Sequence, residues 1–127
     1  MNRFFWVCVG GAAGTGARYL ISGWALTTLG MSFPWGTLAV NLIGSFLIGA
    51  LMHLSLTTQL ISPTLRLALT TGVMGGFTTY SAFNYETLRY LQDGARLYAL
   101  ANIVLMLVGC LAAGAAGLWA ARLLVGH

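Results

Sequence analysis

Apolar residues fill four long stretches of the chain, and polar residues gather in the short segments between them. A helix needs about 20 consecutive, mostly apolar residues to cross a membrane. We therefore expect an all-α membrane protein with one four-helix transmembrane domain over residues 1–127 and no separate water-soluble domain. The predicted spans extend from about Phe4 to Thr28, Thr37 to Thr58, Pro63 to Leu91 and Leu97 to Val125.

Weak helix formers interrupt the third apolar stretch, where residues 75–86 read GGFTTYSAFNYE. Paired glycines and paired β-branched threonines disfavour a helix at this point. As one straight helix the stretch would also reach roughly 43 Å, against about 30 Å for the hydrocarbon core. The pattern predicts a break near MGGFTT, close to the membrane midplane.

This interruption of the helix pattern has two interpretations. Carbonyl groups freed from a helix can bind an alkali cation, which gives a midplane ion site as one hypothesis. The other is that Gly75 and Gly76 only allow a close helix crossing, with no break.

Aromatic and polar side chains alternate after the predicted break. A step of about 100° per residue places Tyr80, Phe83, Asn84 and Thr87 on one helix face, with Glu86 at its edge. Ring edges carry positive partial charge, so beside hydroxyl and amide donors they could replace the water around a small anion. A packed aromatic pair with polar neighbours is the alternative.

Three polar residues lie inside other spans. Asn41 and Asn102 could each donate a hydrogen bond to an anion or to a neighbouring helix. Arg18 is costly within an apolar span, so we expect it to face protein or water and to have a partner. It could tether one end of the bundle or draw anions towards a vestibule.

Turn residues and small residues predict how the helices end and pack. Ser62 is the expected N-cap before Pro63, and Gly94 suits a helix C-terminus. Small residues four apart, which let helix backbones approach closely, recur as Gly10 and Gly14, Gly72 and Gly76, and Ala113 and Gly117.

Composition excludes several function classes. The chain is 58% hydrophobic and 6% charged, and its basic residues are scattered arginines, which argues against nucleic-acid binding. Glu86 and Asp93 are its carboxylates, and their separation offers no acid and base pair for hydrolysis. His53 has no second ligand at metal-binding spacing. We expect no enzymatic activity.

The arginines divide almost evenly between the two membrane sides. Arg3, Arg66 and Arg122 would lie on one side, and Arg89 and Arg96 on the other. Because positive loop charge sets orientation, this balance permits insertion in both directions and an antiparallel homodimer. A weakly oriented monomer is the alternative.

Three motifs together resemble the Fluc (CrcB-type) fluoride channels over nearly the whole chain: GGAAGTGAR, GTLAVNLIGSFLIG and TTGVMGGFTTYSAFNYE. The resemblance implies a fluoride-selective channel that exports fluoride passively and so reduces its toxicity. It also implies a dual-topology, antiparallel homodimer in the bacterial inner membrane, with a structural sodium ion at its centre.

The resemblance also implies roles for particular residues. The backbone carbonyls of Gly75 and Thr78 would bind the sodium ion. Asn41, Tyr80, Ser81 and Phe83 would line the fluoride pore, whereas Arg18 and Glu86 would lie at a pore mouth or vestibule.

This chain departs from the family pattern at two places. The first aromatic position is usually Phe and is Tyr80 here, and Asn102, Met106 and Cys110 follow a line where hydroxyls are more common. Permeation should survive the tyrosine with an altered rate, because a ring edge remains.

Two other function classes fit a small four-helix membrane protein. A proton-coupled multidrug exporter would need a carboxylate in its first span, and this span has Arg18 and no acid. A non-conducting accessory subunit would explain the glycines but would leave Asn41 and the aromatic pair without a task.

Overall fold

The computed structural model describes residues 1–126, which form four helical segments joined by short turns. The first, second and fourth segments are α1 (Asn2–Leu29), α2 (Trp35–Thr57) and α6 (Arg96–Val125). The third is divided into α3 (Pro63–Leu67), η1 (Ala68–Met74), α4 (Gly75–Phe77) and α5 (Tyr80–Gln92). Each predicted span lies on one of these four segments, and the ends agree to within two residues.

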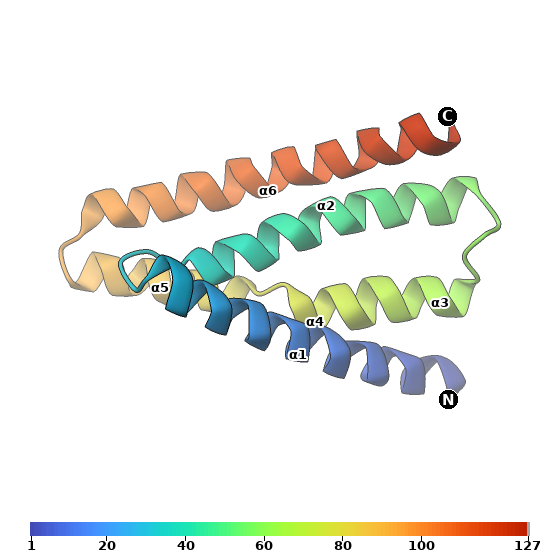
Figure 1. Ribbon diagram of the computed structural model, residues 1–127, viewed down its shortest axis with the longest axis horizontal. Coiled ribbons are helices and arrows are strands. Elements are labelled where there is room, and N and C mark those ends of the chain that lie inside the picture. The colour runs from blue at the N-terminus through green and yellow to red at the C-terminus, as the bar shows by residue number, and fades with distance from the viewer. Residues whose placement is uncertain (127) are drawn as a thin grey trace.

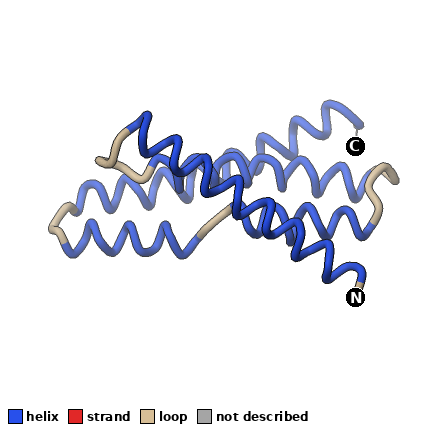
Figure 2. Tube along the Cα trace, turned by 60° about the horizontal axis from the view of Figure 1, so that its bottom comes forward, coloured by secondary structure: helices blue, strands red, loops and turns tan. Residues whose placement is uncertain are grey.

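The four segments run back and forth, so that each is antiparallel to the next (Figure 1). Both ends of the described chain and the α2–α3 turn lie at one end of the bundle, and the other two turns lie at the opposite end (Figure 1). Helix α1 crosses the other segments obliquely (Figure 2). The predicted division of the arginines between two ends therefore agrees with the chain path.

Composition alone marks two of these helices as membrane spans. Helices α2 and α6 are long and apolar enough to cross a membrane, with mean hydropathies of 1.8 and 2.2 in their most apolar parts. Glycines, threonines and arginines dilute the apolar residues of α1, and the third segment is divided into shorter helices. Membrane crossing by these two segments stays a prediction.

The third segment contains the predicted break, and the break falls at Thr78 and Thr79. Both residues have extended backbone, with φ and ψ of −86° and 157° at Thr78 and −150° and 117° at Thr79. The helix resumes at Tyr80, where the Thr79 side chain caps it by accepting from the Ala82 amide at 3.3 Å. The sequence did not predict the π-helical turn of η1, which precedes the break.

The predicted caps of the third segment are confirmed. The Ser62 hydroxyl accepts a hydrogen bond from the Leu65 amide at 3.2 Å, and Pro63 occupies the first helical turn. At the other end the turn passes through Gly94 with φ of 75°, a conformation that glycine adopts without steric cost.

Glycines allow the closest helix contacts. A Cβ atom at Gly10 or Gly14 would overlap the backbone of η1, and one at Gly76 would overlap the backbone of α1. A Cβ atom at Gly117 would likewise meet the backbone at Phe46 of α2. The predicted small-residue pairs therefore bring α1 against η1 and α4, and α6 against α2.

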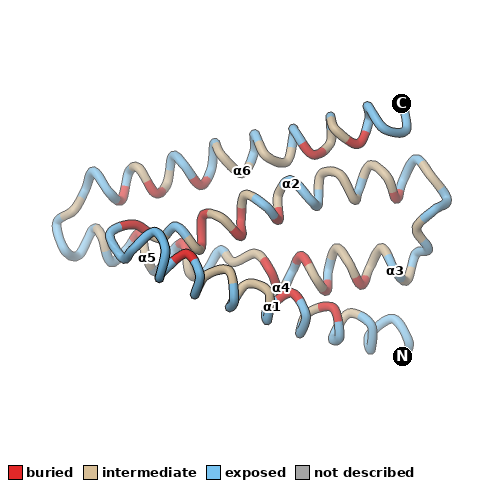
Figure 3. The backbone as a smooth tube through the Cα atoms, in the orientation of Figure 1, coloured by how far each residue is buried: buried red, intermediate tan, exposed pale blue. Residues whose placement is uncertain are grey.

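Buried residues follow the inner faces of the segments, and the outer faces are exposed (Figure 3). A small apolar core joins the α1–α2 turn, α2, α5 and α6 through Phe33, Leu38, Phe83 and Met106. Many large apolar side chains remain on the outside, including Phe4, Trp24, Leu111 and Trp119. Such a surface suits lipid or another apolar partner better than water.

Candidate functional site

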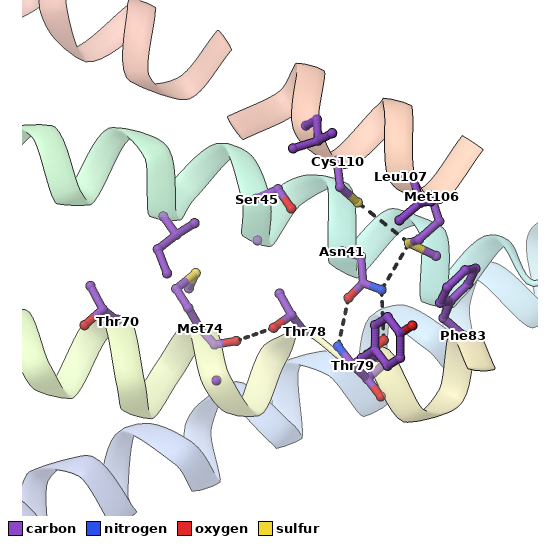
Figure 4. A pocket seen from close by; sticks show the side chains of 15 residues that line it. Asn41, Ser45, Thr70, Met74, Thr78, Thr79, Phe83, Met106, Leu107 and Cys110 are labelled. Atoms are coloured by element: carbon purple, nitrogen blue, oxygen red, sulfur yellow. Dashed lines mark hydrogen bonds between the residues drawn. The ribbon is translucent and has the colours of Figure 1, made fainter. Parts of the chain in front are cut away.

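A groove of about 480 Å³ opens beside the helix break, between α2, the third segment and α6 (Figure 4). Its wall combines a few polar groups with many apolar ones, as is common in small-ligand sites. The lining residues are Asn41, Gly44, Ser45 and Ile48 from α2; Thr70, Met74, Gly75, Thr78, Thr79, Tyr80 and Phe83 from the third segment; and Met106, Leu107, Cys110 and Leu111 from α6.

Asn41 holds the extended backbone of the break. Its side-chain oxygen accepts from the Thr79 amide at 2.8 Å, and its Nδ2 donates to the Thr79 carbonyl at 2.9 Å (Figure 4). The two bonds satisfy backbone groups that a continuous helix would have paired internally. Asn41 thus replaces the missing helical partners of Thr79.

Gly44 lets α2 come close enough for this contact. It lies three residues after Asn41, on the same side of α2. A Cβ atom at Gly44 would overlap the methyl group of Thr78. The NLIG motif therefore supplies both the side chain that binds the break and the space that the break occupies.

The remaining Nδ2 hydrogen of Asn41 points to a sulfur atom. Asn41 Nδ2 lies 3.2 Å from Met106 Sδ, and Cys110 Sγ lies 3.7 Å from the same sulfur (Figure 4). Thioether sulfur is a weak acceptor. Asn41 therefore has two strong bonds to the backbone and one weak bond inside the groove.

The break also removes the helical donors of two carbonyl groups. In a continuous helix the Thr79 amide would donate to the Gly75 carbonyl, and the Ala82 amide would donate to the Thr78 carbonyl. Here the Thr79 amide bonds Asn41 and the Ala82 amide bonds the Thr79 hydroxyl. Both carbonyls belong to groove-lining residues, and their oxygens have the chemistry that an alkali cation needs.

The two aromatic residues differ in exposure. Tyr80 and Phe83 pack edge to face, with centroids 5.6 Å apart and an interplanar angle of 71°. Phe83 is 6% exposed and belongs to the apolar core, whereas Tyr80 is 73% exposed. Tyr80 therefore lines the groove with most of its side-chain surface free on a single chain.

Polar side chains of α5 contact other segments away from the groove. Thr37 donates to Glu86 Oε1 at 2.6 Å, and Asn102 donates to Thr87 at 3.0 Å. Within residues 1–126, Glu86 Oε2 and Asn102 Oδ1 are enclosed without a hydrogen-bond partner. Asn102 is fully buried, so of the three polar or sulfur residues noted on α6 only Met106 and Cys110 line the groove.

Arg18 bonds a backbone group rather than another side chain. Its Nε donates to the Gly76 carbonyl at 2.9 Å, next to the break. The expected partner of Arg18 is therefore a carbonyl that the break has released from its usual donor.

Five of the eight predicted site residues meet in the groove: Asn41, Gly75, Thr78, Tyr80 and Phe83. Arg18, Ser81 and Glu86 are outside its lining. Ser81 is exposed and its hydroxyl lies 3.3 Å from that of Thr79.

Sequence reasoning missed the parts played by Thr37 and Thr79. Thr37 precedes Asn41 by four residues and so shares its helix face, which was a usable signal. Thr79 stands directly before a helix start, where threonine is a common N-cap.

The amino-acid sequence was compared with protein-family models and with known proteins. The model of the family described as "CrcB-like protein, Camphor Resistance (CrcB)" matches residues 5–118. The protein named "Fluoride-specific ion channel FluC" from Sorangium cellulosum (strain So ce56) is 57% identical over 125 residues, which cover 98% of each chain.

Proteins with the same name from other bacteria are also similar over almost their whole length. That of Anaeromyxobacter dehalogenans (strain 2CP-1 / ATCC BAA-258) is 52% identical, covering 99% of this chain and all of its own. That of Geobacter sulfurreducens (strain ATCC 51573 / DSM 12127 / PCA) is 48% identical, covering 96% and 98%. These names describe ion channels and not enzymes.

Proposed function

This chain belongs to the CrcB-like family, and from that premise we propose that it is a fluoride-selective ion channel. The observation that carries the proposal is full-length similarity, at up to 57% identity, to proteins named as fluoride-specific channels. The groove supports it, because a hydrogen-bond donor and aromatic rings lie together there among apolar side chains.

The groove offers a dehydrated anion a small set of substitutes for water. The Nδ2 of Asn41 can donate a hydrogen bond, and the edges of Tyr80 and Phe83 carry positive partial charge. Apolar residues such as Ile48 and Leu107 offer no such compensation. An anion that loses water in the groove can replace part of it with this donor and these ring edges.

Passive export follows from the chemistry of the ion. Fluoride enters a cell as the neutral acid and dissociates in the less acidic cytoplasm. A membrane potential that is negative inside favours exit of an anion by about 2.3 kcal/mol per 100 mV. A selective pore in the bacterial inner membrane, formed by a multi-pass protein, would therefore lower internal fluoride without an energy source.

The active unit in this proposal is an antiparallel homodimer with dual topology. The almost even distribution of arginines supports insertion in both directions. In support, the ring of Tyr80 is 73% exposed and the space around Gly75 is open on a single chain, so a second copy could cover both. One chain alone leaves the groove open at these two residues.

A structural sodium ion would lie where the two breaks meet. The carbonyls of Gly75 and Thr78 would bind it, since their helical donors are used by Asn41 and Thr79. Two carbonyls from each copy would surround the ion, which supplies positive charge and links the subunits. The neighbouring Gly76 carbonyl would take no part in this site, since it already accepts from Arg18 Nε.

Efflux from liposomes tests the channel directly. Purified protein is reconstituted into vesicles loaded with fluoride or with chloride, and ion-selective electrodes follow release after a potassium ionophore removes the membrane potential. We expect rapid loss of fluoride and retention of chloride, with protein-free vesicles as the control. Retention of both anions by a well-folded dimer would refute the proposal and turn attention to an accessory role.

A further inference from the structure

The one weak hydrogen bond of Asn41 lies in the groove in which the proposed function would place the anion. The Nδ2 of Asn41 has two hydrogens, one on the Thr79 carbonyl at 2.9 Å and one towards Met106 Sδ at 3.2 Å. The side-chain oxygen is held by the Thr79 amide. Thus the amide plane is fixed by the break, and its second hydrogen is aimed at the thioether.

We propose that Met106 is a positioning residue that holds the second amide hydrogen of Asn41 while the groove is empty and releases it to an arriving anion. The inference rests on the proposed function and adds a residue to it. Met106 has no charge and need not touch the ion, because it acts through Asn41.

The exchange needs little rearrangement. An anion that approaches from the groove competes with a weak, neutral acceptor, and charged acceptors bind N–H groups more strongly. The two bonds between Asn41 and Thr79 remain in place, so the helix break keeps its shape during the exchange. Met106 is 4% exposed and packed in the apolar core, which keeps its sulfur in position between ions.

The thioether also sets how tightly the groove holds its ion. A strong acceptor at this position would retain the amide hydrogen, and an apolar side chain would leave the hydrogen unpaired. An unpaired buried donor raises the free energy of the empty state and so increases the apparent affinity for an anion. The sulfur gives an intermediate affinity, which suits an ion that must both enter and leave.

Replacement by apolar side chains of similar size tests the inference. Met106→Leu and Met106→Ile differ in shape but share the loss of the acceptor. The matched controls are Met52→Leu and Met52→Ile, since Met52 lies on α2 outside the groove lining and is 38% exposed. Initial fluoride efflux is measured against internal fluoride concentration for all five proteins, with the dimer content checked by size-exclusion chromatography.

We expect both Met106 variants to lower the half-saturating fluoride concentration on the order of threefold to tenfold, without raising the maximal rate. Both Met52 variants should leave the half-saturating concentration unchanged. If Met106 had a purely structural role, its variants would change the dimer content or the maximal rate. They would not change the half-saturating fluoride concentration alone.

Two results would overturn the inference. One is a half-saturating concentration equal to that of the unmodified protein in either folded Met106 variant, and the other is an equal shift in the Met52 variants. If the unmodified protein itself releases no fluoride, the proposed function fails instead, so the two failures are distinguishable.

Discussion

At the scale of single residues, the aromatic ring of Phe83 has two tasks that a substitution can separate. The ring fills the core beside Met106 and offers its edge to the groove. Phe83→Ile keeps an apolar side chain but leaves a small cavity, so we expect the free energy of unfolding to fall by about 1–3 kcal/mol. Because the ring edge is lost, fluoride efflux should fall to the level of protein-free vesicles.

The control for this substitution is Phe5→Ile, which makes the same change on an exposed part of α1. Efflux and dimer content of both variants are measured in parallel. Normal fluoride efflux by Phe83→Ile would remove Phe83 from the proposed pathway.

The pair of hydrogen bonds between the Asn41 side chain and the Thr79 backbone could not be predicted from the sequence. Asn41 was a candidate donor because it is polar within an apolar span, and the pattern left open what it would bond. Its partners depend on how α2 is rotated against the third segment, which is a property of packing and not of local sequence. The sequence likewise gave no sign that the unpaired atoms of Glu86 and Asn102 would be enclosed.

At the scale of elements, a substitution at Gly44 tests whether α2 must lie this close to the helix break. Gly44→Ala places a methyl group on the methyl group of Thr78. Overpacking of this kind costs about 1–3 kcal/mol, and we expect slower fluoride efflux and a lower melting temperature.

The second-site change Thr78→Ser should rescue this defect. It removes the methyl group and keeps the hydroxyl that donates to the Met74 carbonyl at 2.9 Å. We expect the double variant to recover most of the efflux and stability in the same assays. Equal defects in the single and double variants would show that the methyl contact is not the cause.

The helical turn at Gly75 leads to a prediction about assembly of the dimer. A Cβ atom at Gly75 meets nothing within 4 Å on a single chain, and the residue has helical backbone. Gly75→Val should therefore fold as a helical protomer but lose the dimer or its bound sodium, measured by circular dichroism, size exclusion and the sodium dependence of efflux.

The contrasting variant is Gly14→Val, whose side chain would overlap the backbone of Val73 within the same chain. It should lose the protomer fold itself. If Gly75→Val keeps full efflux with sodium still required, the assignment of the cation site to this turn is wrong.

The elements themselves were largely predictable, for local reasons. Ser62 with Pro63 signals a helix start, and the paired glycines and threonines mark the break because each disfavours a helix through its own backbone or side chain. The π-helical turn η1 could not be predicted, since its residues ALTTGVM would also fit an ordinary α-helix.

At the scale of the whole molecule, the charge balance predicts that orientation can be controlled. Asn2→Lys with Gln59→Lys adds charge at the end of the bundle that holds both chain ends, and Ser32→Lys with Gln92→Lys adds it at the opposite end. Each biased protein should insert in one direction and lose fluoride efflux in cells, because positive charge stays on the cytoplasmic side.

Expression of the two biased proteins together should restore efflux, since each supplies the orientation that the other lacks. Internal fluoride is measured in cells that express either protein or both. Full activity of one biased protein alone, with its single orientation verified by cysteine labelling, would exclude the antiparallel dimer.

The π-helical turn has a consequence for how this chain can vary. Such a turn amounts to one surplus residue within an α-helix, and a residue corresponds to about 100° of rotation. The number of residues between Pro63 and Thr78 therefore fixes the rotation at which the break faces Asn41. Apart from the glycines that contact α1, such as Gly72 and Gly76, insertions and deletions in this stretch should be far more damaging than substitutions.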